Sequence, residues 1–183
     1  MKNVILLHGR GASAESMMSF ADVLPKANYI ALQAPNNTRE WYPHSFLNPL
    51  EDNEPHITNA VSMIKDAIGH YDKSTVIILG FSQGACLASE YAIRNPGSYG
   101  GIIMLSGGII GNEINDAVDM NNTRVFVGCS DNDPYIPLWR VNETIAFFEK
   151  SNATVSSHIY VGSSHTVTDE EISCIRDIIL GTL

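Results

Sequence analysis

The sequence lacks any apolar run of the length that crosses a membrane. A helical bilayer span needs ~20 consecutive apolar residues, and no stretch of this chain approaches that length. The run nearest to a signal peptide, Val4 to Leu7, is interrupted after four residues by His8 and Gly9. We therefore expect neither a membrane span nor a secretory signal.

Basic side chains are also scarce. Eleven Lys and Arg stand against twenty Asp and Glu, which gives a formal net charge of −9 at pH 7. Such a charge repels nucleic-acid phosphates and anionic lipid surfaces alike. Nucleic acid is therefore not an expected partner, whereas the oligomeric state is left open, a homodimer included.

Cysteine is the third scarce element of the sequence. The three cysteines, Cys86, Cys129 and Cys174, are odd in number, widely spaced and without metal-ligand spacing. This pattern favours reduced thiols in a cytoplasm over a disulfide framework. The H-E-x-x-H motif of zinc hydrolases is missing as well. We therefore expect a cytoplasmic protein without a metal ion.

Apolar residues, in contrast, make up 44% of the 183 residues. A chain of this length can bury one sizeable core, so we expect residues 1–183 to form a single domain. Short apolar runs, several of them rich in β-branched residues, predict strands. The expected strands are residues 4–8, 28–33, 75–80, 101–105, 123–128 and 156–161.

Helical patterns lie between these strands. Met17, Phe20, Ala21 and Leu24 recur at helical spacing, and residues 57–68 form a clearer apolar stripe. A capping-box spacing at 168–171 precedes the last helical pattern. This alternation predicts an α/β fold, a doubly wound and mainly parallel six-stranded sheet with helices on both faces.

One serine, Ser82, stands between a buried apolar run and a helical pattern. The run Val76 to Leu79 ends in Gly80-Phe-Ser82-Gln-Gly84, and the helical pattern begins at Ala85. Glycines in such a strand-to-helix turn remove Cβ atoms that would collide, and the helix amino end leaves N–H groups free for an oxyanion. The pattern suits a nucleophile, although a capping serine in an ordinary turn shares it.

A serine nucleophile needs a base and an acid that orients the base. Asp131 and Asp133 lie in the loop after the fifth expected strand, and His165 is the one histidine in the loop after the sixth. Carboxyl ends of parallel strands meet at one edge of a sheet, so these loops and Ser82 are expected to lie together. The chain order Ser, Asp, His is that of α/β-hydrolases.

Four motifs in order resemble the phospholipase/carboxylesterase family of small α/β-hydrolases, which includes acyl-protein thioesterases. They are Leu6-Leu-His-Gly-Arg-Gly11, Gly80-Phe-Ser-Gln-Gly84, Asp133-Pro-Tyr-Ile-Pro137 and the loop bearing His165. The resemblance covers nearly the whole chain. It implies a carboxylic ester or thioester hydrolase without a cofactor, the strand order 2-1-3-4-5-6, and Asp133 rather than Asp131 as the acid.

The same resemblance implies the roles of the site residues. Ser82 forms an acyl-enzyme, His165 is the base, Asp133 orients it, and the backbone N–H groups of Arg10 and Gln83 form the oxyanion hole. The Arg10 side chain either meets an anionic substrate group or braces its loop, and bracing is the favoured interpretation. A binding module without catalysis and a hydrolase of peptide or carbon–carbon bonds stay open as alternatives.

A long connection at residues 34–55 is expected near the serine. Connections of roughly twenty residues are unusual in compact domains and tend to be functional. Trp41, Tyr42 and Phe46 can supply an apolar wall of a substrate pocket, or they can simply cover the sheet edge. Because no insertion large enough for a lid follows the fourth expected strand, we expect an open, shallow site suited to short or flexible acyl groups.

Overall fold

The central sheet consists of six parallel strands. The computed structural model describes residues 1–35 and 37–182; residue 36, in the expected connection 34–55, and residue 183, at the end of the expected domain, lie outside this description. The strands are β1 (Asn3–Leu7), β2 (Asn28–Leu32), β3 (Val76–Phe81), β4 (Gly101–Leu105), β5 (Arg124–Ser130) and β6 (Thr154–Tyr160). Their order is β2-β1-β3-β4-β5-β6, and each neighbouring pair is parallel. The α/β fold and the strand order are confirmed.

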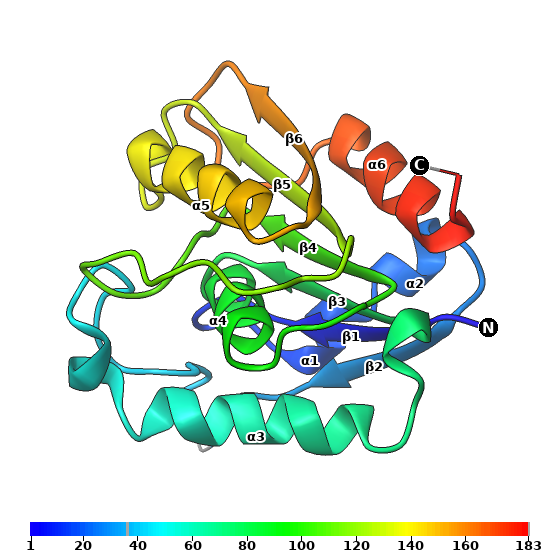
Figure 1. Cartoon of the computed structure of the whole chain (residues 1–183), viewed down its shortest axis with the longest axis horizontal. Coiled ribbons are helices and arrows are strands. Elements are labelled where there is room, and N and C mark those ends of the chain that lie inside the picture. Colours follow the sequence, from blue (N-terminus) through cyan, green and yellow to red (C-terminus); the bar gives the residue numbers. More distant parts are fainter. Residues whose placement is uncertain (36, 183) are drawn as a thin grey trace.

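Helices cover both faces of this sheet (Figure 1). The α-helices are α1 (Ala14–Met17), α2 (Phe20–Val23), α3 (His56–Ile68), α4 (Gln83–Arg94), α5 (Leu138–Lys150) and α6 (Asp169–Leu180). Two 3₁₀ segments, Leu50–Asn53 and Lys73–Thr75, precede α3 and β3. No helix within residues 1–35 and 37–182 is long and apolar enough to span a membrane.

The two apolar cores follow from alternation along the strands. Ile5 and Leu7 of β1 pack in the core beneath α3, α4 and α5, whereas Val4 and Leu6 pack in the core beneath α1 and α6. Successive side chains of a strand point to opposite faces. A strand covered on both faces must therefore be apolar throughout, which explains the unbroken apolar runs in the sequence.

The first helical pattern folds as two short helices rather than one. The hydroxyl of Ser19 donates to the carbonyl of Ser16, and that of Ser16 donates to the carbonyl of Ser13. Serine side chains that bond nearby backbone compete with helical hydrogen bonds. Met17 and Leu24 of the pattern are nevertheless buried in the core.

The last helix begins as its sequence predicts. The Thr168 side chain accepts a hydrogen bond from the Glu171 N–H, and the Glu171 carboxylate accepts one from the Thr168 N–H. This reciprocal capping box satisfies two donors that a helix start otherwise leaves without partners. It fixes the position at which the chain enters α6 after the loop that carries His165.

Candidate active site

Ser82 occupies a strained turn between β3 and α4. Its backbone has φ 55° and ψ −119°, a region that L-residues seldom adopt. A Cβ added at Gly80 would lie 2.1 Å from the Gly84 carbonyl oxygen, and one at Gly84 would lie 2.2 Å from the Leu7 carbonyl oxygen. Glycine at both positions therefore lets α4 start directly against β1 and β3. This is the local geometry of a nucleophile elbow.

His165 links Ser82 to Asp133. The Nε2 atom of His165 lies 2.9 Å from Ser82 Oγ, and its Nδ1 atom lies 2.7 Å from Asp133 Oδ2. An ionised carboxylate can only accept hydrogen bonds, so Nδ1 carries the proton and Nε2 is left to accept from the serine hydroxyl. These three side chains form a triad-like arrangement.

The Asp133 carboxylate is held from its other side by backbone. Its Oδ1 atom accepts from the N–H groups of Tyr135 and Ile136, at 2.8 and 3.0 Å, and its side chain is fully buried. Asp131 has a different contact, because its carboxylate accepts from the Gly162 N–H at 2.9 Å. Asp131 thus joins the two loops, while Asp133 is the carboxylate that reaches the histidine.

Two aromatic rings flank His165. The Phe81 and Tyr135 ring centroids both lie 4.9 Å from that of the imidazole, Phe81 tilted by 46° and Tyr135 edge-on at 71°. Aromatic pairs favour such tilted and edge-on arrangements over face-to-face stacking. The imidazole is therefore oriented both by its hydrogen bonds and by ring packing. Sequence reasoning missed both aromatic neighbours.

The loop after β1 lies beside the serine. Leu7 pairs with Gly80 in the sheet, and a Cβ added at Gly9 would lie 3.2 Å from Ser82 Cβ. Within residues 1–35 and 37–182, the backbone N–H groups of Arg10 and Gln83 donate to no acceptor. Two free N–H groups beside the serine are what an oxyanion hole requires.

A hydrogen-bond network supports this loop. The His8 side chain is completely buried; its Nε2 accepts from the Ala34 N–H at 3.0 Å, and its Nδ1 lies 2.7 Å from the Gly9 carbonyl oxygen. Because a backbone N–H can only donate, Nε2 is unprotonated and Nδ1 carries the proton. Burial correspondingly lowers the pKa of His8 below its ordinary value.

Trp41 and Gln83 extend the same network. The Trp41 indole N–H donates to the His8 carbonyl at 2.8 Å, and the Gln83 side-chain oxygen accepts from the Trp41 backbone N–H at 2.8 Å. The Gln83 amide also donates to the Tyr42 carbonyl. Gln83 thus ties the turn after Ser82 to the long connection before α3.

The Arg10 side chain is occupied by the same connection. Its guanidinium pairs with Glu40 and donates to the carbonyls of Tyr42 and His44, at 2.9 and 3.2 Å. It donates to the Pro43 carbonyl as well, at 3.2 Å. In this structure the Arg10 side chain braces the loop after β1, which is the interpretation favoured from the sequence.

A cavity of about 520 Å³ opens at Ser82. Its walls include Tyr42, Phe46, Phe81, Cys86, Tyr135 and Ile136, together with His165. Trp41, which we expected in this wall, is buried against His8, with ring centroids 5.0 Å apart, and does not line the cavity. Cys86 lies one helical turn beyond Ser82, so helical spacing could have revealed it.

In the cavity wall, burial raises the pKa of two ionisable groups, Tyr42 and Cys86. Burial raises the pKa of the Cys86 thiol to about 11, so this side chain is a neutral, apolar part of the wall at pH 7. No group of three or more His, Cys, Asp or Glu able to hold a metal ion occurs among the residues that the structure describes.

Comparison with known proteins agrees with this geometry. The family model described as Phospholipase/Carboxylesterase matches residues 1–182. Acyl-protein thioesterase 1 of Kluyveromyces lactis is 29% identical to this chain, and the alignment covers 93% of this chain and 88% of that protein. Acyl-protein thioesterase 1 of Saccharomyces cerevisiae is 26% identical, and the alignment covers 100% of this chain and 93% of that protein.

Solved structures of related proteins have the same fold as this chain. The phospholipase/carboxylesterase from Dyadobacter fermentans superposes with a TM-score of 0.88 at 34% identity, covering 98% of this chain and 90% of that one. The Bacillus cereus carboxylesterase has a TM-score of 0.79 at 18% identity, and the superposition covers 100% of this chain and 89% of that one. It shows that the two proteins share a fold. This chain belongs to the phospholipase/carboxylesterase family, whose members are esterases and thioesterases.

Proposed function

We propose that this chain hydrolyses carboxylic esters or thioesters through an acyl-enzyme on Ser82. The observation that carries the proposal is the continuous contact from Ser82 Oγ to His165 Nε2, and from His165 Nδ1 to the buried Asp133 carboxylate. Family membership supports an ester or thioester as substrate.

In the first step, Ser82 Oγ attacks the carbonyl carbon of the substrate while His165 Nε2 takes the hydroxyl proton. Asp133 accepts the Nδ1–H of the resulting imidazolium and stabilises its charge. The carbonyl oxygen becomes an oxyanion, for which the N–H groups of Arg10 and Gln83 are the available donors. His165 then returns the proton to the leaving alcohol or thiol.

In the second step, water attacks the acyl group on Ser82. His165 Nε2 now takes a proton from that water, and the two N–H groups again receive the oxyanion. Collapse of this second intermediate breaks the ester bond to Ser82 Oγ, which regains its proton from His165. The carboxylic acid leaves and the free serine is restored.

The cavity supports short or flexible acyl groups. Tyr42 and Phe46 provide apolar wall, while Tyr135 is 69% exposed, so the site is open toward solvent on that side. An open wall offers a long chain little additional burial beyond its first carbons. We therefore expect acetate and butyrate esters to be cleaved at least as well as octanoate.

The decisive experiment compares two serines of the same cavity. Ser82→Ala should abolish nearly all turnover of p-nitrophenyl esters, by up to about a millionfold, because triad members act as a unit. It should also abolish labelling by a fluorophosphonate. Ser45→Ala, on the cavity wall, is the matched control and should retain both. Turnover that survives in Ser82→Ala, or a wild type that neither labels nor hydrolyses these esters, would reject the proposal.

A cytoplasmic location belongs to the same proposal. Cys86, Cys129 and Cys174 are all free thiols in the structure. Free thiols in this number are typical of reducing compartments. We expect the thermal midpoint of the protein to be the same with and without a reductant.

A further inference from the structure

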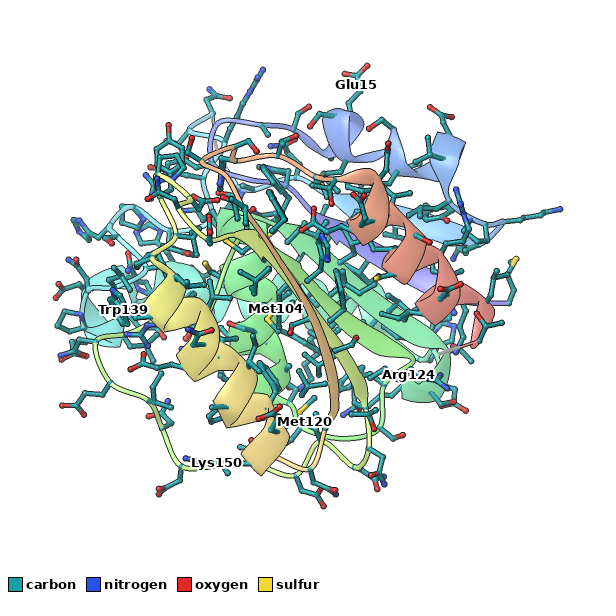
Figure 2. The ribbon with its side chains drawn as sticks, turned by 90° about the horizontal axis from the view of Figure 1, so that it is seen from above. Glu15, Met104, Met120, Arg124, Trp139 and Lys150 are labelled. Atoms are coloured by element: carbon teal, nitrogen blue, oxygen red, sulfur yellow. The ribbon has the colours of Figure 1, made fainter. Side chains whose placement is uncertain are left out.

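One edge of the sheet is open. Strand β6 (Thr154–Tyr160) is the last strand in the order β2-β1-β3-β4-β5-β6 and has no neighbour beyond it. Figure 1 shows it at the outer margin of the ribbon, and Figure 2, seen from above, shows it running across the front of the sheet with α5 and α6 to its two sides. Helix α5 packs on one face of β6, whereas α6 packs on β4 and β5, and the edge of β6 is left exposed.

The two edge strands of the sheet, β2 and β6, differ in exposure. Strand β2 has five residues, all of them half-buried, whereas four of the seven residues of β6 are exposed. Proteins usually guard an exposed edge with a charge, a proline, a bulge or a very short strand. The sequence Thr-Val-Ser-Ser-His-Ile-Tyr contains no proline and no acidic or lysine side chain.

The unpaired backbone groups of β6 can be assigned. The Thr154 N–H donates to Thr123 and the Tyr160 carbonyl accepts from Asp131, so the even-numbered residues of the strand face β5. Backbone groups alternate in direction along a strand, so Val155, Ser157 and Ile159 direct theirs outward. In the part of the chain that the structure describes, these outward groups have no backbone partner outside the strand.

The strand is also nearly symmetric about its centre. If two copies pair antiparallel with Ser157 opposite Ser157, Val155 of each copy faces Ile159 of the other. All three pairs are residues with outward backbone groups, so each pair can exchange two hydrogen bonds, about six in total. Val and Ile favour strands and form stabilising cross-strand pairs. A two-fold axis satisfies both copies with the same contacts.

We propose that β6 is the interface of a homodimer, in which a second copy of this chain adds its own β6 antiparallel and extends the sheet. Strand pairing alone buries less surface than a standard protein interface, so the dimer is in rapid exchange with a micromolar dissociation constant, on the order of 10 µM. The active site lies at the carboxyl ends of the strands and stays open in this dimer, so hydrolysis does not depend on it.

The experiment measures oligomeric state by sedimentation from about 1 to about 200 µM, around the expected dissociation constant. The wild type should shift from monomer to dimer over this range. Ser157→Pro removes an outward N–H that β5 does not use, and should raise the dissociation constant at least about tenfold. Ser157→Ala keeps that N–H and is the matched control, which should dimerise as the wild type does.

A second variant covers the case in which proline prevents folding. Ile159→Lys places a charge on an exposed position of the edge, opposite the apolar Val155 of the other copy, and removes the Val–Ile cross-strand pair, so it should also weaken association about tenfold. Circular dichroism and ester hydrolysis report whether each variant is folded. A wild type that stays monomeric throughout, or a dimer that both variants leave unchanged, would overturn the proposal.

Discussion

At the scale of single residues, Asp131 and Asp133 show how a loop separates two identical side chains. The two carboxylates lie two residues apart, yet Asp133 contacts His165 and Asp131 contacts the Gly162 N–H. The Asp133 carboxylate points inward because the N–H groups of Tyr135 and Ile136 close a turn onto it. Position in the turn, rather than chemistry, distinguishes the two.

This difference predicts opposite outcomes for the same substitution. Asp133→Asn should lower kcat by about 10⁴-fold, because an amide donates toward His165 and favours the wrong tautomer. Asp131→Asn retains an oxygen that accepts from Gly162 and should leave kcat within about threefold, as for a surface substitution that keeps its hydrogen bond. Steady-state kinetics with one p-nitrophenyl ester measures both. Equal losses in the two variants would show that the assignment of the acid is wrong.

His8 predicts a pH dependence of stability. Burial lowers the pKa of the His8 imidazole in the folded protein below 6.5, and its Nε2 must stay unprotonated to accept a hydrogen bond from the Ala34 N–H. The unfolded chain therefore binds a proton more readily, and the stability that neutral His8 contributes is present above pH 6.5 and lost as the pH falls through the folded pKa. The slope from one such group is at most about 1.4 kcal/mol per pH unit.

The measurement is chemical denaturation between pH 7.5 and about 5. His8→Gln preserves an acceptor without the titration, so its stability should fall less steeply toward acid than that of the wild type. His70→Gln, at an exposed position after α3, is the control and should follow the wild type. If His8→Gln and the wild type have parallel pH profiles, the stability of the protein does not depend on the protonation of His8.

At the scale of elements, the site depends on how closely α4 approaches β1. A Cβ at Gly84 would lie 2.2 Å from the Leu7 carbonyl oxygen, which is backbone and cannot move aside. Gly84→Ala should therefore lower the free energy of unfolding by at least about 3 kcal/mol. Gly11→Ala is the comparison, because Gly11 has φ 77° but open space around it, and should cost only about 1 kcal/mol. Similar losses in both would mean that helix packing at Gly84 is looser than the structure shows.

The same scale separates what the sequence predicts from what it cannot. All six strands lie where apolar runs predict them, within two residues at most ends, because strands buried on both faces must be apolar throughout. The bounds of β5 and β6 differ most from the expected ones, each by one residue at one end and two at the other: 123–128 against Arg124–Ser130, and 156–161 against Thr154–Tyr160. The strand order follows from the family resemblance, because an apolar run does not indicate which strands lie beside it in the sheet.

Sequence motifs predict the positions of the triad-like residues, but not which side chains pack into the cavity wall. Ser82, Asp133 and His165 lie in short loops whose positions follow from strand ends, and the structure brings them together. Trp41 was expected in the pocket wall, but its indole is drawn inward by the His8 carbonyl. The wall contributed by Tyr135 arises from contacts between separate loops, which local patterns do not reveal, whereas helical spacing from Ser82 could have revealed Cys86. The catalytic roles of Ser82, Asp133 and His165 and the binding roles of the wall residues stay predictions.

At the scale of the whole molecule, charge acts against the proposed association. Each copy has a formal net charge of −9, so two copies repel one another at pH 7. The pairing edge itself has no acidic or lysine side chain, so salt should act on the net repulsion rather than on contacts within the interface. That residues 1–183 form one domain stays a prediction; the net charge applies to the chain in either case.

Screening this repulsion should strengthen the dimer. The Debye length falls from about 20 Å at low salt to below about 8 Å at several tenths molar, so the association constant should rise about three- to tenfold between these conditions. Sedimentation of the wild type at both ionic strengths measures this, and Ser157→Pro should stay largely monomeric at both. An association constant that falls with salt would mean that ion pairs hold the two copies together, which the uncharged β6 edge cannot supply.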